Sequence, residues 1–185
     1  MNAEEETTPE MSATAKVRPR DQLAREYDQL WSDFGPSLVR LASSYESEFQ
    51  AREDLLQEIR LAIWVALPRF RGESSLRTFV FRIAHNRALT HMWRRKRAGV
   101  AEEPQDIPDP RSSPETETMQ RIDQLRLFEA IRLLPIPFRQ ILTLALEDFS
   151  HAEIADILGI SENNVAVRMN RARKQLRESL GSKKG

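Results

Sequence analysis

Four prolines fall within residues 98–118 and divide the chain into two parts. The same segment holds six acidic residues and a single arginine, so it has little apolar surface to bury. A segment of this composition does not form a packed core, and we expect an acidic, flexible linker there. The rest of the chain then makes two short units, 21–97 and 119–181, with a disordered tail over 1–20 and a short tail over 182–185.

Helical periodicity runs through the first unit. Apolar residues recur every three or four positions over 23–42, 52–67 and 76–93, and this spacing predicts helices. Pro36 is expected in the first turn of a second helix, because a proline fits there without losing a backbone hydrogen bond. Pro68 is expected to end the helix over 52–67.

The second unit contains a compact pair of helices. Ser150 followed by Glu153 fits a capping box at the start of the first helix. Gly159 supplies the positive φ that the chain needs to leave that helix, and Ser161 can cap the next one. A short helix, a glycine turn and a polar, basic helix make a helix-turn-helix, whose second helix lies in the major groove of DNA.

Two further helices are predicted over 120–134 and 138–146. The chain has only six glycines and 7% aromatic residues, so it lacks the turn glycines and β-branched runs that sheet proteins need. The expected fold class is therefore all-α. Two small helical domains, a bundle and a helix-turn-helix unit, are joined by a flexible linker.

Charge is distributed unevenly along the chain. There are 28 basic and 28 acidic residues, so the formal net charge is zero. Residues 51–97, however, hold eleven basic side chains against four acidic ones, and residues 161–185 hold seven against two. Two basic segments on either side of an acidic linker indicate two surfaces for a polyanion such as DNA.

Several classes of function are disfavoured by what the sequence lacks. Without cysteine there can be no disulfide, no catalytic thiolate and no cysteine-ligated zinc. The three histidines have no metal-ligand spacing, and we expect His85, His91 and His151 to be structural or exposed. No catalytic constellation or phosphate-binding loop is visible, so we expect no enzyme, no cofactor, no metal and no small-molecule substrate. No run is long and apolar enough for membrane insertion, which favours a cytoplasmic protein.

The order of several short runs resembles the extracytoplasmic-function class of sigma-70 RNA polymerase sigma factors. In the first unit, the runs that resemble sigma region 2 are Asp54–Glu58, Ala62–Trp64, Phe70–Ser75, Arg77–Phe79 and Arg82–Asn86. In the second unit, the runs that resemble sigma region 4 are Leu134-Pro135, Arg139–Leu142, Ser150–Leu158 and Val165–Arg173. A match of both units in this order, with a linker between them, is far more specific than either alone.

The resemblance implies three binding sites. Core polymerase would bind the helix that carries Asp54, Gln57, Glu58, Arg60, Leu61 and Trp64. The promoter −10 element would be bound by Phe70, Arg71, Phe79, Arg82, Asn86, Arg87, Arg94, Arg95, Lys96 and Arg97. The −35 element would be bound as duplex by Ser161, Asn163, Asn164, Arg168, Asn170, Arg171 and Lys174.

One pair of residues departs from the family pattern. The family usually has a lysine or arginine directly after the valine of the recognition helix, and a small polar residue after that. In this chain those positions hold Ala166 and Val167. The departure shifts the expected base contacts towards Asn163, Asn170 and Arg171, and towards the neighbouring Asn164.

Other interpretations stay open beside this one. The basic run 94–97 could be a solvated helix end, Phe79 fits the apolar stripe of its helix as a core residue, and Trp64 would be part core and part interface. The whole chain could be a sigma-like decoy that captures an anti-sigma protein without touching DNA, although basic residues in both units argue against it. A stand-alone helix-turn-helix regulator would leave the first unit unexplained.

The expected partners follow from the resemblance. They are bacterial core RNA polymerase, promoter DNA and an anti-sigma factor that clamps both domains. The linker would allow the two domains either to be held together or to spread along a promoter. We expect the protein in the cytoplasm, where an anti-sigma factor could hold it at the membrane.

Overall fold

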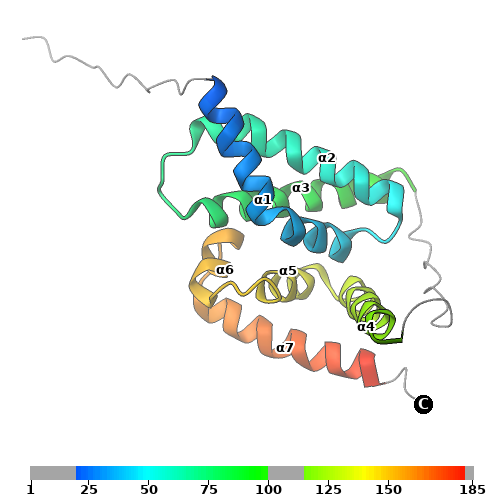
Figure 1. Cartoon of the computed structure of the whole chain (residues 1–185). Helices are drawn as coiled ribbons and strands as arrows, with labels where there is room; N and C mark the ends of the chain where they lie inside the picture. The colour runs from blue at the N-terminus through cyan, green and yellow to red at the C-terminus, as the bar shows by residue number, and fades with distance from the viewer. Residues whose placement is uncertain (1–19, 100–114, 182–185) are drawn as a thin grey trace, which may run out of the picture.

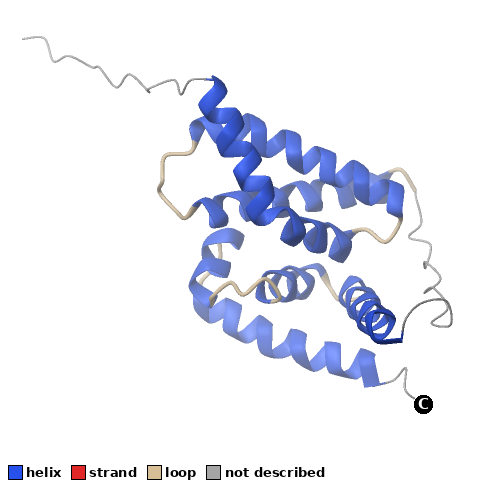
Figure 2. Ribbon diagram, viewed as in Figure 1, coloured by secondary structure: helices blue, strands red, loops and turns tan. Residues whose placement is uncertain are grey.

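The computed structural model describes residues 20–99 and 115–181. Every regular element in these ranges is a helix (Figure 2), which confirms the all-α prediction. The predictions for the N-terminal tail, most of the linker and the C-terminal tail lie outside the described residues. In chain order the helices are α1 (Arg20–Tyr45), α2 (Phe49–Ala66), the short 3-10 helix η1 (Leu67–Arg69), α3 (Leu76–Arg97), α4 (Glu115–Arg132), α5 (Ile136–Ala145), α6 (His151–Leu158) and α7 (Glu162–Gly181).

Helix α1 continues through Pro36, so the prediction that a second helix begins there is wrong. A proline inside a helix removes one backbone hydrogen bond and costs about 3 kcal/mol. The fully buried residues Leu30, Leu38 and Leu41 lie on both sides of the proline at helical spacing. Burial of this continuous stripe against α2 and α3 offsets the cost of the proline.

Helix α4 begins at Glu115, inside the segment predicted as linker over 98–118. The last proline of that segment is Pro114, and no residue after it interrupts a helical backbone. The predicted linker is therefore too long at its C-terminal end, where residues 115–118 are helical.

Side-chain caps begin both α3 and α6, and the capping box predicted for α6 is confirmed. The Thr78 N–H donates to the Ser75 hydroxyl over 3.0 Å and caps α3. Ser150 and Glu153 form the complete capping box of α6. Gly159 ends α6 with a φ of +65°, a left-handed conformation that favours glycine.

The helices form two layers (Figure 1), with α1, α2 and α3 in one and α4 to α7 in the other. In the first layer, Leu55, Ile59 and Ile63 of α2 are fully buried against α1 and α3. In the second layer, α7 packs against α5 and α6 and buries Val165 and Met169. Among the described helices, none combines the length and apolarity that a membrane crossing requires.

The two layers share one core, which the sequence does not predict. Helix α1 contacts α4 and α5, and α3 contacts α6. The rings of Phe81 and Phe149 meet edge to face with centroids 4.8 Å apart. The hydroxyl of Thr143 donates to that of Ser44 over 2.9 Å within the buried interface. Buried side chains of both units therefore form a single cluster.

Candidate nucleic-acid interface

A hollow of about 460 Å³ lies where the loop before α3 meets α3 and α6. Its lining includes four residues predicted to bind the −10 element: Phe70, Arg71, Phe79 and Arg82. Phe70 and Phe79 are half-buried, and the centroids of their rings are 4.9 Å apart. Gly72 turns the loop beside them with a φ of +77°. Aromatic rings next to cations can stack a nucleobase and hold its phosphate.

Arg82, one of the cations that line this hollow, already has an acidic partner. A guanidinium nitrogen of Arg82 lies 2.6 Å from a carboxylate oxygen of Asp156 and donates to the Asp156 carbonyl over 3.0 Å. Asp156 belongs to α6, the first helix of the helix-turn-helix. An acidic residue of the second unit therefore forms an ion pair with Arg82, which is predicted to bind the −10 element. Sequence analysis missed this residue, because 74 positions separate the two side chains.

A second hollow, of about 640 Å³, forms a groove between α2 and α3. Leu61 and Val65 lie on its α2 side with 65% and 58% of their surface exposed. Asn86 and Arg87 line its α3 side. The groove therefore brings a residue predicted to bind polymerase next to residues predicted to bind the −10 element, and it separates Asn86 from the hollow that holds Phe70.

The rest of the predicted polymerase face has a mixed character. Asp54, Gln57 and Arg60 are exposed on α2, whereas Trp64 is half-buried. The Trp64 ring meets the ring of Tyr27 edge to face at 5.1 Å. Trp64 thus contributes to the core as well as to the surface of α2.

The four basic residues at the end of α3 fall into two pairs. Arg94 donates to Glu58 over 2.5 Å. Arg95 lies 3.0 Å from Glu46, which is 4% exposed, and also bonds to a second acid at the start of α2. Lys96 and Arg97 are exposed, and the Lys96 ammonium lies over the Trp93 ring. Half of the basic run therefore fastens α3 to the rest of its own unit.

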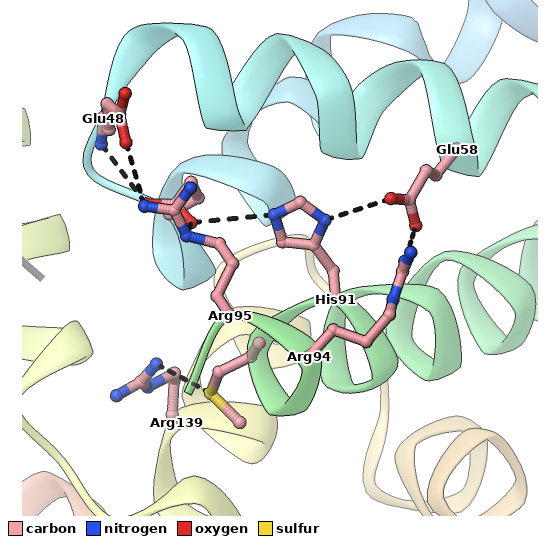
Figure 3. Close-up of polar contacts among 8 residues, drawn as sticks. Glu48, Glu58, His91, Arg94, Arg95 and Arg139 are labelled. Carbon is pink, nitrogen blue, oxygen red and sulfur yellow. Dashed lines mark hydrogen bonds and ion pairs between the residues drawn. The ribbon is translucent and has the colours of Figure 1, made fainter. Parts of the chain in front are cut away.

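His91 lies at the centre of these ion pairs (Figure 3). Its Nδ1 is 3.2 Å from Glu58, and its Nε2 is 3.7 Å from Glu46, an ion-pair distance too long for a hydrogen bond. Glu46 raises the pKa of His91, burial opposes the rise, and Glu58 adds to it. Burial raises the pKa of Glu46, but His91 and Arg95 outweigh it, so this pKa is below its ordinary value. His91 thus lies between carboxylates from two other segments, and both carboxylates favour its protonated form.

His85 has a different environment. It is 1% exposed, and its Nε2 lies 2.9 Å from the hydroxyl of Tyr45. Burial lowers its pKa to about 3, so the ring is neutral at physiological pH. His85 and His91 are both structural side chains, as expected, while His151 is exposed on α6. In the described part of the chain, no cluster of three metal-ligating side chains occurs.

Helix α7 divides into a buried face and a polar face. The Asn164 N–H donates to the Ser161 hydroxyl over 3.3 Å, so Ser161 caps the helix as predicted. Val165, Met169 and Ala172 are buried against α5 and α6. The residues predicted to bind the −35 element lie away from this face; all are exposed except the half-buried Arg168: Ser161, Asn163, Asn164, Arg168, Asn170, Arg171 and Lys174.

Val167 belongs to the polar face as well. It is 41% exposed, whereas its neighbour Ala166 is half-buried. In the sequence, Val167 is notable only as a departure from the family pattern. An apolar side chain therefore stands among the hydrogen-bonding side chains of the recognition helix.

Comparison with known proteins identifies both units of the chain. Residues 30–98 match the family described as Sigma-70 region 2, and residues 124–176 match the family described as Sigma-70, region 4. The chain is 30% identical over 172 residues to the RNA polymerase sigma factor NccH of Alcaligenes xylosoxydans xylosoxydans. That alignment covers 88% of this chain and 89% of NccH.

Two solved structures have the same architecture. The sigma factor RpoE from Bartonella quintana, solved in complex with the anti-sigma factor NepR, superposes with a TM-score of 0.68 and 25% identity. The superposition covers 85% of this chain and 98% of that one. CnrH, solved in complex with the cytosolic domain of CnrY, gives a TM-score of 0.65 and 26% identity over 88% and 94% of the two chains. With both sigma regions matched in order, the chain belongs to the extracytoplasmic-function class of sigma-70 RNA polymerase sigma factors, which are non-enzymatic transcription initiation factors.

Proposed function

We propose how the three binding tasks of a sigma factor are divided over this chain. Helix α2, including the α2 side of the α2–α3 groove, binds core RNA polymerase. The hollow beside Phe70, together with Asn86 on α3, captures the −10 element as a single strand. The outer face of α7 binds the −35 element as duplex. The observation that carries the proposal is the division of α7 into a buried apolar face and an exposed face of amides and cations.

The polymerase site is supported by apolar exposure. Leu61 and Val65 are one helical turn apart on α2, and each exposes more than half of its surface. Exposed Gln57 and Arg60 flank them. An exposed apolar centre with a polar rim is typical of a protein-binding surface.

The −10 site is supported by the chemistry of its lining. Extruding a base from duplex DNA costs a few kcal/mol. Stacking on an aromatic ring recovers about 1–3 kcal/mol per base, and the tilted pair of Phe70 and Phe79 offers such a surface. Arg71 and Arg82 supply charge for the phosphates.

The two DNA sites are too close together to bind both promoter elements in this arrangement. Arg82 at the −10 hollow touches Asp156 in the helix-turn-helix. The nominal positions −35 and −10 are about 25 base pairs apart, which is about 85 Å of B-form DNA at about 3.4 Å per base pair. We infer that the units separate on the promoter, which breaks the pair of Arg82 with Asp156 and frees Arg82 for DNA.

An anti-sigma partner is inferred from the solved relatives. The structure of RpoE was determined with the anti-sigma factor NepR, and that of CnrH with the cytosolic domain of CnrY. By likeness, we propose that an anti-sigma factor holds this chain in its closed arrangement and covers the α2–α3 groove. We propose that the protein acts in the bacterial cytoplasm, where polymerase and promoter DNA would be its partners.

The first test is co-elution of the full-length protein with bacterial core RNA polymerase on gel filtration, followed by transcription from a cognate promoter. Wild-type protein is expected to co-elute and to initiate. Asn86→Ala is expected to co-elute but to lose promoter opening, whereas Gln29→Ala on the exposed side of α1 serves as the matched control. A protein that binds an anti-sigma partner but neither polymerase nor DNA would instead be a decoy.

A further inference from the structure

Val167 lies at the centre of the exposed face of α7. Successive residues on an α-helix are about 100° apart. The buried residues Val165, Met169 and Ala172 define the inner direction of α7. Position 167 lies within about 15° of the opposite direction on this geometry. Its side chain is therefore aimed away from the protein core, towards the side on which Lys174 also lies.

The neighbours of Val167 on this face are all hydrogen-bonding groups. Asn163 is one turn before it, Asn170 and Arg171 are one turn after it, and all three are exposed. Arginine and asparagine side chains can bond base edges in pairs, arginine to guanine and asparagine to adenine. Valine can make no such bond, so its contribution to recognition must come from an apolar contact.

The major groove offers one apolar group for such a contact, the 5-methyl group of thymine. Valine suits it because its two methyl groups are held by a stiff, β-branched χ1 torsion and need little ordering on binding. We propose that Val167 is a specificity-determining residue, and that it contacts a thymine methyl group in the −35 element. This inference rests on the proposed role of α7 in binding that element.

The test uses DNA that the protein itself selects. Duplexes of about 30 base pairs are enriched from a randomised pool on the full-length protein bound to core polymerase. Each thymine of the selected −35 element is then replaced by deoxyuridine, which removes only the methyl group. One replacement is expected to weaken binding of the wild-type protein about fourfold, the effect of one buried methyl group.

The Val167→Ala variant completes a double-mutant cycle. It should bind the thymine duplex about fourfold more weakly than wild type, and the deoxyuridine replacement should then cost it nothing further. Leu180→Ala, which truncates another exposed apolar residue of α7, should keep the wild-type sensitivity to deoxyuridine. The inference is overturned if no replacement weakens wild-type binding, or if Val167→Ala remains as sensitive as wild type.

A further variant separates this inference from the proposed function. Arg171→Ala should weaken binding to the same duplex whether or not Val167 contacts a methyl group. If Arg171→Ala has no effect, the assignment of α7 to the −35 element is wrong. If Arg171→Ala weakens binding while every deoxyuridine duplex binds like the parent, only the role given to Val167 is wrong.

Discussion

The basic end of α3 and the outer face of α7 have similar sequences but different surroundings. Both are helical and rich in arginine. On α3, Arg94 and Arg95 are bonded to acids from α2 and from the connection between α1 and α2. On α7, neither Arg168 nor Arg171 makes an ion pair within the described residues. A count of basic residues therefore does not distinguish a helix that is fastened to its own domain from one that is free to bind DNA.

The pairing has consequences for both energy and function. An arginine that leaves a carboxylate to bind a phosphate loses one ion pair as it gains another, so its net contribution to DNA affinity is small. An arginine that is only solvated gains the full release of counterions from DNA. We therefore expect substitutions of Arg94 and Arg95 to affect stability, and substitutions on the outer face of α7 to affect DNA binding.

The largest effect is expected from locking the two units together. The hydroxyl oxygens of Ser44 and Thr143 are 2.9 Å apart, so sulfur atoms at these positions could bond. The chain has no cysteine of its own, so Ser44→Cys with Thr143→Cys would form the sole disulfide. Transcription should be lost when the variant is oxidised and regained on reduction, because the units cannot separate and Arg82 stays paired with Asp156.

The same disulfide allows the two DNA sites to be tested independently. Helix α7 is exposed in the closed arrangement, so the oxidised variant should still bind a −35 duplex. The Ser44→Cys variant alone should respond to neither oxidation nor reduction. Full transcription by the oxidised double variant would show that the units need not separate on the promoter.

The next effect distinguishes Arg171 from Arg95 by DNA binding. Replacing a side chain that bonds a base edge costs about 1–3 kcal/mol, so Arg171→Ala should weaken binding to the −35 duplex roughly tenfold or more. Arg95→Ala should leave that affinity unchanged, since Arg95 is bonded to Glu46. Equal losses in the two variants would contradict the proposed separation of roles.

Stability should show the opposite order. Arg95→Ala leaves Glu46, which is 4% exposed, without the guanidinium of its ion pair, and a buried charge that loses its partner costs about 2 kcal/mol. Arg171→Ala removes an exposed side chain and should change the free energy of unfolding by less than about 0.5 kcal/mol. Urea unfolding of the two variants measures both values.

A smaller effect is expected in the salt dependence of DNA binding. Each phosphate contact contributes about 0.9 to the slope of log affinity against log salt concentration. Lys174→Ala should therefore reduce the slope for −35 duplex binding by about one, without changing sequence preference. Arg94→Ala on α3 is the matched comparison, and it should leave this slope as it is.

The smallest effect concerns pH. The pKa of His91 is raised in the folded state by Glu46 and Glu58, so the protonated ring stabilises the fold. This stabilisation is complete below the unfolded pKa of about 6.5 and is lost as the pH rises through the higher folded value. His91→Gln should remove this part of the pH dependence, which unfolding by urea at several pH values would measure. If His91 made the wild-type protein more stable as the pH rises over this window, the proposed stabilisation by its protonated form would be contradicted.

Sequence analysis predicted the helices better than their ends and their contacts. The capping box of Ser150 and the left-handed turn at Gly159 were found because both depend on residues within one helical turn. The path of α1 through Pro36 was missed, because local propensity is outweighed there by the burial of a stripe against other helices. The start of α4 was placed too late, because composition over a whole segment hides its last four residues.

Local sequence is sufficient for the helical fold class, for the caps of α6 and α7, for the polar and apolar faces of α7 and for the resemblance to sigma factors. These properties depend on spacings of a few residues, which the helical repeat converts directly into faces. The partners of Arg82, Arg94 and Arg95 have no such local signal. Their acids come from α6, from α2 and from the connection between α1 and α2, with 74 positions between Arg82 and Asp156. Ion pairs of this kind form only when packing brings those segments together. Which cations remain available to DNA is therefore a property of the packed molecule.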